Sequence, residues 1–188
     1  MTAATISYDL LDSAGASSLA DDLVALQQLG IAGTPEADDP FESPERFRDR
    51  LTRYMISPGF ALVTARADDL VGYAFGYLLQ PDARWWAGLL DPVPPDVLTE
   101  TGSRTFAVNE IHVRPSWRGQ GIATGVHSRL VHSGDWERAT LLVRQDNDAR
   151  HQYTHWGYTQ LSRLKPFPDS PTYLALVLPI DTSTSNHG

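Results

Sequence analysis

The stretch that decides the fold runs from Phe106 to Val131 and reads FAVNEIHVRPSWRGQGIATGVHSRLV. Phe106 to Val113 is a predominantly apolar run and predicts a strand. Gly119 to Val131 predicts a helix, because its large apolar residues share one helical face: Ile122, Val126, Leu130 and Val131. A strand, a glycine-containing loop and a helix therefore follow one another here.

The glycine loop at this junction predicts an anion-binding site. Glycine lets the backbone come close to a ligand, and the first N–H groups of a helix have no partner within the helix. The helix dipole adds a positive potential at the same place, which favours phosphates. On its own, however, the pattern is also typical of glycines that merely terminate elements.

Three phosphate-binding motifs place glycines before a helix. A P-loop requires Gly-Lys-Ser/Thr, which the chain lacks. A dinucleotide fingerprint requires a third glycine close to the first strand, whereas this loop has two and lies late in the chain. The third motif, Q/R-x-x-G-x-G/A, holds the pyrophosphate of coenzyme A, and it fits Arg118, Gly121 and Ala123.

The residues around the loop carry a family resemblance. The segment from Ile111 to Ala123 closely resembles the central motif of the GNAT superfamily of N-acetyltransferases, and the match extends over about Thr105 to Tyr158. The Trp85-Trp86 pair and the segment Lys165 to Pro168 also resemble actinobacterial-type members. The resemblance implies acetyl-CoA as co-substrate and a GNAT-like α/β fold, with a mixed, mostly antiparallel sheet of about six to seven strands flanked by helices.

The resemblance also implies roles for individual residues. The strand residues Ile111, His112 and Val113 would lie along the pantetheine arm. The backbone N–H groups of the loop would bind the pyrophosphate, and Asn147 and Tyr153 would meet the pantetheine region and the thioester sulfur. The loop residues concerned are Arg118, Gly119, Gln120, Gly121, Ile122, Ala123 and Thr124.

The asparagine position departs from the family pattern. Family members usually have alanine three residues after the asparagine and tyrosine seven after it. Here Ala149 and Tyr153 follow Asn147 by two and six residues. Either the loop is one residue shorter, or Asp146 occupies the asparagine position.

The rest of the chain predicts the other elements of one α/β domain. Strands are expected around Ile6 to Leu10, at Phe60 to Ala65, Leu70 to Leu79, Ala139 to Val143, Tyr158 to Leu164 and Tyr173 to Leu178. Helices are expected at Ser17 to Gly30, with Gly30 as C-cap, after Ser43-Pro44 and at Ala149 to Trp156. Residues 81–103 predict a long irregular loop. The domain is expected to cover residues 1–180, followed by a flexible tail at 181–188.

Glu110 is the first candidate for the base that deprotonates an amine acceptor. It is a carboxylate in an otherwise apolar strand, and alternation places it on the same face as His112, the second candidate. Tyr153 is the candidate general acid for the leaving thiolate. The structural alternatives are an ion pair or an edge position facing water for Glu110, a core hydrogen bond for His112 and ordinary packing for Tyr153.

Aromatic residues in the loops are candidates for an acceptor pocket. Trp85, Trp86, Phe41 and Phe167 could line it, or could simply pack against the core. Asp38, Asp39, Glu42 and Asp91 could attract a cationic acceptor or be merely solvated. His151 and His155 are one turn apart but lack a third ligand, so we expect no metal.

Composition narrows the classes of partner. The chain has 188 residues, a formal net charge of -8 and no cysteine. The charge disfavours nucleic-acid binding, and the absence of cysteine excludes disulfides and fits a cytoplasmic location. No run approaches the ~20 apolar residues of a membrane span. The sequence is compatible with a homodimer.

Three functions therefore remain. The first is an acetyl-CoA-dependent N-acetyltransferase acting on a small-molecule amine or natural product by direct transfer. The second is a protein or peptide acetyltransferase acting at Nα or lysine. The third is a non-catalytic acyl-CoA-binding sensor, which Glu110 and Tyr153 disfavour.

Overall fold

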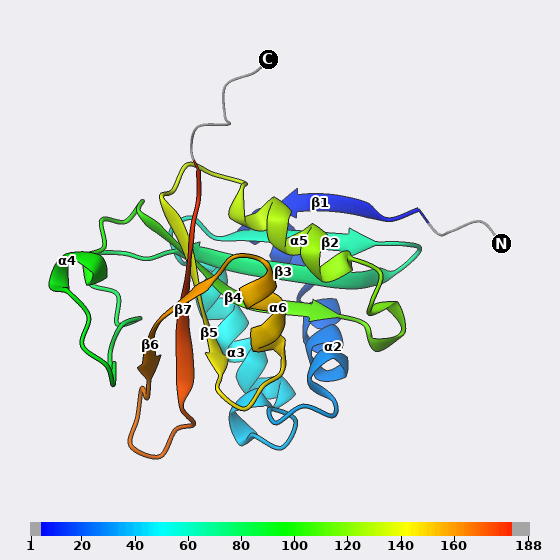
Figure 1. Ribbon diagram of the computed structural model, residues 1–188. Coiled ribbons are helices and arrows are strands. Elements are labelled where there is room, and N and C mark those ends of the chain that lie inside the picture. Colours follow the sequence, from blue (N-terminus) through cyan, green and yellow to red (C-terminus); the bar gives the residue numbers. More distant parts are fainter. Residues whose placement is uncertain (1–4, 182–188) are drawn as a thin grey trace. The chain divides into compact units, whose positions relative to one another are not determined.

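The computed structural model describes residues 5–181 (Figure 1). The strands are β1 (Ser7–Leu11), β2 (Ala61–Arg66), β3 (Leu70–Leu78), β4 (Thr105–Val113), β5 (Arg138–Arg144), β6 (Thr159–Leu164) and β7 (Tyr173–Pro179). The helices are α1 (Ser13–Ser18), α2 (Ala20–Ile31), α3 (Pro44–Met55), α4 (Pro95–Leu98), α5 (Ile122–Val131) and α6 (Ala149–His155), with 3-10 turns η1 (Pro40–Glu42) and η2 (Pro115–Trp117).

The sheet confirms the predicted fold class. Over the described residues, seven strands follow the order β1-β2-β3-β4-β5-β7-β6. Antiparallel pairing joins β1 to β2, β2 to β3, β5 to β7 and β6 to β7, whereas β4 and β5 are parallel. The chain is therefore an α/β protein with a mixed, mostly antiparallel sheet.

The chain forms two compact units, each with part of β4. Unit 1 contains Met1–Tyr77 and Val108–Ser133, and unit 2 contains Leu78–Ala107 and Gly134–Gly188. The prediction of a single domain over residues 1–180 stays a prediction. The tail predicted at 181–188 lies outside the described residues, apart from Asp181.

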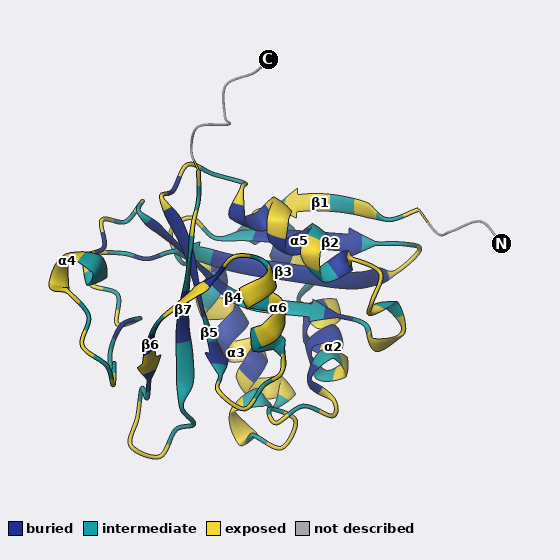
Figure 2. Ribbon diagram, in the orientation of Figure 1, coloured by how far each residue is buried: buried dark blue, intermediate teal, exposed yellow. Residues whose placement is uncertain are grey.

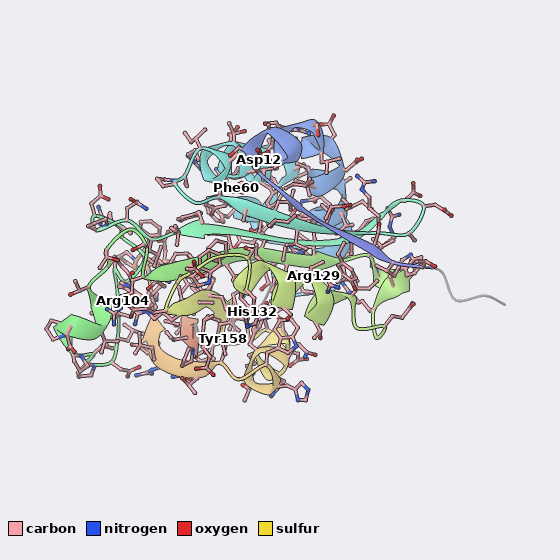
Figure 3. The ribbon with its side chains drawn as sticks, turned by 90° about the horizontal axis from the view of Figure 1, so that it is seen from above. Asp12, Phe60, Arg104, Arg129, His132 and Tyr158 are labelled. Carbon is pink, nitrogen blue, oxygen red and sulfur yellow. The ribbon has the colours of Figure 1, made fainter. Side chains whose placement is uncertain are left out.

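Helices cover both faces of the unit 1 sheet. Helices α2 and α3 lie on one face and α5 lies on the other (Figure 1). The view from above shows the same layers, with Asp12 beside α1 on one side, and Arg129 on α5 and His132 at the end of α5 on the other (Figure 3). Buried and exposed residues alternate around these helices, as expected for helices with one face on a sheet (Figure 2).

The core of unit 1 lies between the sheet and its first three helices. It is built from fully or nearly fully buried apolar side chains: Ala16, Leu23, Val24, Leu26, Phe47, Leu51, Met55, Leu62, Leu70, Tyr73 and Phe75. Full burial of each large aliphatic or aromatic side chain contributes about 1.5–3 kcal/mol. This core gives the second half of β4, which carries Glu110 and His112, a rigid support.

Helix α3 begins as the sequence predicts. Ser43 is the N-cap and its hydroxyl accepts a hydrogen bond from the Arg46 N–H, with Pro44 at the first helical position. The helix predicted over Ser17 to Gly30 is instead two helices, α1 and α2. The earlier start has a local cause, because the Asp12 carboxylate caps α1 by accepting from the Gly15 N–H.

Two predicted helix ends are wrong. Gly30 is not the C-cap of α2, since the helix continues to Ile31 and Ala32 is the C-cap. The helix predicted from Gly119 starts only at Ile122, because Gly119 and Gly121 have φ values of 75° and 77°. Positive φ values are incompatible with a right-handed helix.

Unit 2 is built around β5. Its residues Arg138, Ala139 and Thr140 pair with the first three residues of β4, and its full length pairs with β7. Strand β6 completes this sheet beside β7. The predicted irregular region at 81–103 contains the short helix α4 and an isolated bridge between Leu89 and Leu164.

Candidate active site

Glu110 and His112 form a hydrogen-bonded pair on β4. The His112 Nε2 lies 2.7 Å from the Glu110 Oε2, and the two side chains are 16% and 11% exposed for Glu110 and His112. The strand alternation that placed both residues on one face is therefore confirmed. The pair is largely removed from water but still accessible, which suits a group that exchanges protons with a small molecule.

Helix α2 and strand β3 enclose the imidazole of His112. The ring of Tyr73 lies 5.5 Å from it, and the Tyr73 hydroxyl donates to the carbonyl of Leu23 on α2. At Gly30, also on α2, an added Cβ would lie only 2.6 Å from His112 Nδ1. The ring therefore fills the space that a side chain at Gly30 would need.

A second carboxylate, Glu42, belongs to the same unit. Its Oε2 accepts from Arg50 Nη2 at 2.7 Å and from Gln27 Nε2 at 2.9 Å. Burial raises the pKa of Glu42, the negative charge of Glu110 raises it further, and Arg50 opposes both. The two carboxylates thus repel each other, and a positively charged ligand would relieve that repulsion.

Phe41 is anchored next to Glu42. The guanidinium of Arg50 lies 4.0 Å from the Phe41 ring centroid and also donates to the Phe41 carbonyl. The ring remains about half exposed. Unit 1 thus holds Phe41 in a fixed place beside a carboxylate, although its predicted contact with an acceptor stays a prediction.

The glycine loop after β4 forms an open cradle of backbone groups. A Cβ built at Gly119 or at Gly121 would meet nothing within 4 Å, and no side chain caps α5 in the described structure. Ile122 is buried and Ala123 half-buried, whereas Gln120 is exposed. Positive φ at both glycines and an uncapped helix start are the features that admit a phosphate.

The side chain of Arg118 is directed away from a role in the cradle. Its Nη2 donates to the carbonyl of Gly30 at 2.7 Å, which ties the loop to the end of α2. What the loop offers to an anion is therefore its backbone N–H groups and the helix dipole. The predicted role of Arg118, binding through its backbone N–H, stays a prediction.

Asn147 of unit 2 is engaged at the start of α6. Its Oδ1 accepts from the Ala149 N–H at 2.8 Å, while Asp146 forms an ion pair with Arg144 at 2.8 Å. The short spacing between Asn147 and Ala149 thus has a local structural use as a turn. The prediction that Asn147 contacts the cofactor is not tested by this contact.

Tyr153 of unit 2 lies half-buried on α6. Its ring packs edge-on against Trp156 and Tyr158, with centroids 5.6 Å and 6.0 Å away. Burial raises the pKa of Tyr158, followed by the effect of Tyr153. These aromatic contacts fix the Tyr153 ring in orientation, which a proton donor requires, and its catalytic role stays a prediction.

The two tryptophans of unit 2 differ in their surroundings. Trp86 is buried and donates to Glu100 at 2.9 Å, and Glu100 pairs with Arg138 at 3.0 Å. Trp85 is half-buried, and its Nε1 is buried without a hydrogen-bond partner among the described residues. Trp86 thus has a packing role in its own unit, and contact of either ring with an acceptor stays a prediction.

Residues 5–181 contain no group of three or more potential ligands that could hold a metal ion. Over the same residues, none of the helices has the length and apolar character needed to cross a membrane.

The sequence did not indicate Gln27 and Arg50 as partners of Glu42, or Gly30 as the neighbour of His112. Gln27 and Arg50 look like ordinary polar residues of amphipathic helices, and only the folded chain brings them to Glu42. Gly30 did carry a signal. A glycine within a helical pattern costs about 1 kcal/mol relative to alanine and often marks a close contact.

Known proteins share the sequence pattern and the fold of this chain. The model of the acetyltransferase (GNAT) family matches residues 28–158. None of the curated proteins matches the chain. Among solved structures, a putative acetyltransferase from Acinetobacter baylyi has 13% identity and a TM-score of 0.65, covering 96% of each chain.

Two further solved structures have acceptors named or represented in their descriptions. The Escherichia coli ribosomal-protein-S18-alanine N-acetyltransferase has 13% identity and a TM-score of 0.61, covering 98% of this chain and 99% of its own. Arabidopsis thaliana NAA60, in complex with a bisubstrate analogue, has 14% identity and a TM-score of 0.62, covering 94% and 100%. At such identities the likeness concerns the fold, while the family match spans most of the chain. The chain belongs to the acetyltransferase (GNAT) family and is an acyltransferase.

Proposed function

We propose that the protein transfers the acetyl group of acetyl-CoA directly to the primary amine of a small molecule. The observation that carries this proposal is the Glu110–His112 pair on the strand that leads into the glycine cradle. Strand β4 thus carries the proposed acid–base group and leads into the loop that is proposed to bind phosphate. A protein that only senses acyl-CoA has no use for the first of these.

Acetyl-CoA would supply the activated acetyl group, and the residues present fit its pyrophosphate. The open space at Gly119 and Gly121 and the uncapped start of α5 leave room for phosphate oxygens at the N–H groups of residues 118–124. The backbone of Ile111 and Val113 is proposed to pair with the pantetheine arm. Asn147 and Tyr153 are proposed as further contacts from unit 2.

The acceptor amine arrives protonated and must lose a proton before it can attack. Glu110 is proposed to accept that proton at its carboxylate, with Glu42 adding negative potential that draws the ammonium in. Tyr153 is proposed to donate the proton of its hydroxyl as the thiolate leaves, and its phenolate to take up the second proton that the nitrogen loses on becoming an amide. No covalent intermediate with the protein is required.

A protein or peptide amine is the alternative acceptor. It is supported by the similarity in fold to the E. coli ribosomal-protein-S18-alanine N-acetyltransferase. We favour the small molecule because both acidic groups lie in a confined environment with small exposed fractions, 16% for Glu110 and 17% for Glu42. A flexible peptide would need an open groove around this pair.

A screen for release of free CoA tests the proposal. The enzyme is mixed with acetyl-CoA and a library of amines that includes both small amines and N-terminal peptides. Turnover of small amines with little turnover of peptides is the expected result. Turnover of peptides alone would favour the alternative, and binding of acetyl-CoA without turnover of any amine would favour a sensor.

A further inference from the structure

Gly30 is the next-to-last residue of α2, and a glycine is less favourable than an alanine in a helix. The helix continues past it to Ile31, and its φ is not positive, so the backbone does not require glycine. Alanine is a much better helix former at such a position. The reason for glycine must therefore be sought in what lies next to it.

The neighbour of Gly30 is the imidazole of His112. A Cβ at position 30 would lie 2.6 Å from Nδ1 and 3.2 Å from both Cβ and Cγ of His112. Cβ and Cγ belong to the inner part of the side chain, so a rotation of the ring alone would relieve the contact with Nδ1 and leave two contacts that are tighter than usual. With any residue but glycine, His112 would have to move.

Each nitrogen of the His112 ring has a fixed neighbour. Nε2 bonds to the Glu110 carboxylate at 2.7 Å, while Nδ1 faces the backbone of Gly30. An ionised carboxylate can only accept, so in the neutral form of the imidazole Nε2 carries the proton and Nδ1 the lone pair. The Nδ1 side of the ring lies next to α2 at Gly30.

We infer that Gly30 and His112 are positioning residues. Because Gly30 has no side chain, the imidazole of His112 can occupy the space next to it and is held there. The imidazole in this position holds Glu110 by a hydrogen bond to Oε2. Among the described residues, the hydrogen bond of the Glu110 side chain is made by that oxygen. Its Oε1 is then the atom that takes the proton from the acceptor. This inference rests on the proposed function only for its last step, the proton transfer.

A spectroscopic test needs no substrate. In the full-length protein labelled with ¹⁵N, long-range ¹H–¹⁵N spectra near pH 7 should show His112 protonated at Nε2 and unprotonated at Nδ1. Gly30→Ala should replace this signature by a mixture of tautomers. The neighbouring Leu29→Ala, at an exposed position of α2, should leave it intact. An unchanged signature in Gly30→Ala would overturn the inference.

A double-mutant cycle gives a second test, in which the effect of Gly30→Ala on the Tm should have opposite signs in the wild-type and His112→Ala backgrounds. Gly30→Ala should lower the Tm of the wild-type protein, because the new methyl group collides with the ring. In a His112→Ala background the same change should raise the Tm, because the space is empty and alanine favours the helix. A change in Tm of the same sign in both backgrounds would show that Gly30 does not position His112. If Gly30→Ala alone is poorly folded, the comparison of the double variant with His112→Ala still gives a result.

Turnover separates this inference from the proposed function. With an amine found in the screen, Gly30→Ala should lower kcat by about 10- to 100-fold, the usual cost of misplacing a catalytic group by roughly 1 Å, while the KM for acetyl-CoA stays within about twofold. Unchanged kcat would refute a role in positioning. If the wild-type enzyme acetylates no amine, the proposed function fails, whereas the spectra and the double-mutant cycle still decide whether Gly30 positions His112.

Discussion

At the scale of single residues, the site depends on which charges are buried and which partners they have. The contact between Glu110 and His112 could be predicted from the sequence, because residues two apart in a strand share a face. The contacts of Glu42 could not, because Gln27 and Arg50 come from helices whose packing the sequence does not specify. The contact of Gly30 with His112 could not be predicted either, since the two residues are 82 positions apart in the chain.

Removal of Glu42 should cost far more stability than removal of an exposed acid in an ion pair of the same length. Arg50 and Glu42 are 5% and 17% exposed, so Glu42→Ala leaves a buried guanidinium without its partner and should cost about 3 kcal/mol. The Arg48–Asp21 pair is also 2.7 Å long, but its side chains are 47% and 90% exposed. Asp21→Ala should therefore have almost no effect.

Chemical denaturation of the two variants checks this contrast. Equal losses of unfolding free energy in both would show that burial does not distinguish the pairs.

At the scale of elements, the strand–loop–helix unit was predicted well except at its junction. The sequence indicated strand β4 and the buried face of α5, whose Ile122, Val126, Leu130 and Val131 are all buried. It did not indicate that the helix starts at Ile122, because the φ of a glycine is set by the turn around it. That late start leaves the open cradle in front of the helix.

Substitution of Gly121 should weaken acetyl-CoA binding beyond the effect of backbone strain. Gly121 and Gly33 both have positive φ, 77° and 78°, and a Cβ at either meets nothing within 4 Å. Alanine at each should cost about 1–2 kcal/mol of stability. In Gly121→Ala the cradle is altered as well, so its Kd for acetyl-CoA should rise at least about tenfold.

Gly33→Ala is the matched control and should keep the wild-type Kd. Calorimetric titration with acetyl-CoA measures both variants. Equal affinities in the two would remove the cradle from the account.

The buried His127 of α5 should make the protein less stable in acid. Burial lowers the pKa of His127 to about 4, and the nearby His132 contributes. Because the folded pKa is below the ordinary value of 6.5, the unfolded chain takes up the proton first, and stability falls as the pH drops from about 6.5 to about 4. The full effect is roughly 3 kcal/mol.

Unfolding free energies between pH 7 and pH 4 check this prediction. His127→Gln should flatten the slope over this range, whereas His151→Gln, at an exposed position of α6, should keep it. A wild-type slope in His127→Gln would contradict the assignment.

At the scale of the whole molecule, the order of elements could be predicted but the order of strands in the sheet could not. The hairpin of β2 and β3 followed from local pattern, since Asp68 and Asp69 form the turn. The insertion of β7 between β5 and β6 depends on pairings between distant segments, which periodicity does not encode. The division of β4 between two units was equally hidden.

The central claim is that Glu110 removes the proton of the acceptor, and the most direct test is the turnover of Glu110→Gln near pH 7. Glutamine has almost the same size and cannot act as the base, so kcat/KM for the amine should fall by about 10²- to 10⁴-fold. The Kd for acetyl-CoA should stay within about twofold of the wild-type value, because the cradle is unchanged. Wild-type turnover by Glu110→Gln, with normal acetyl-CoA binding, would contradict the account.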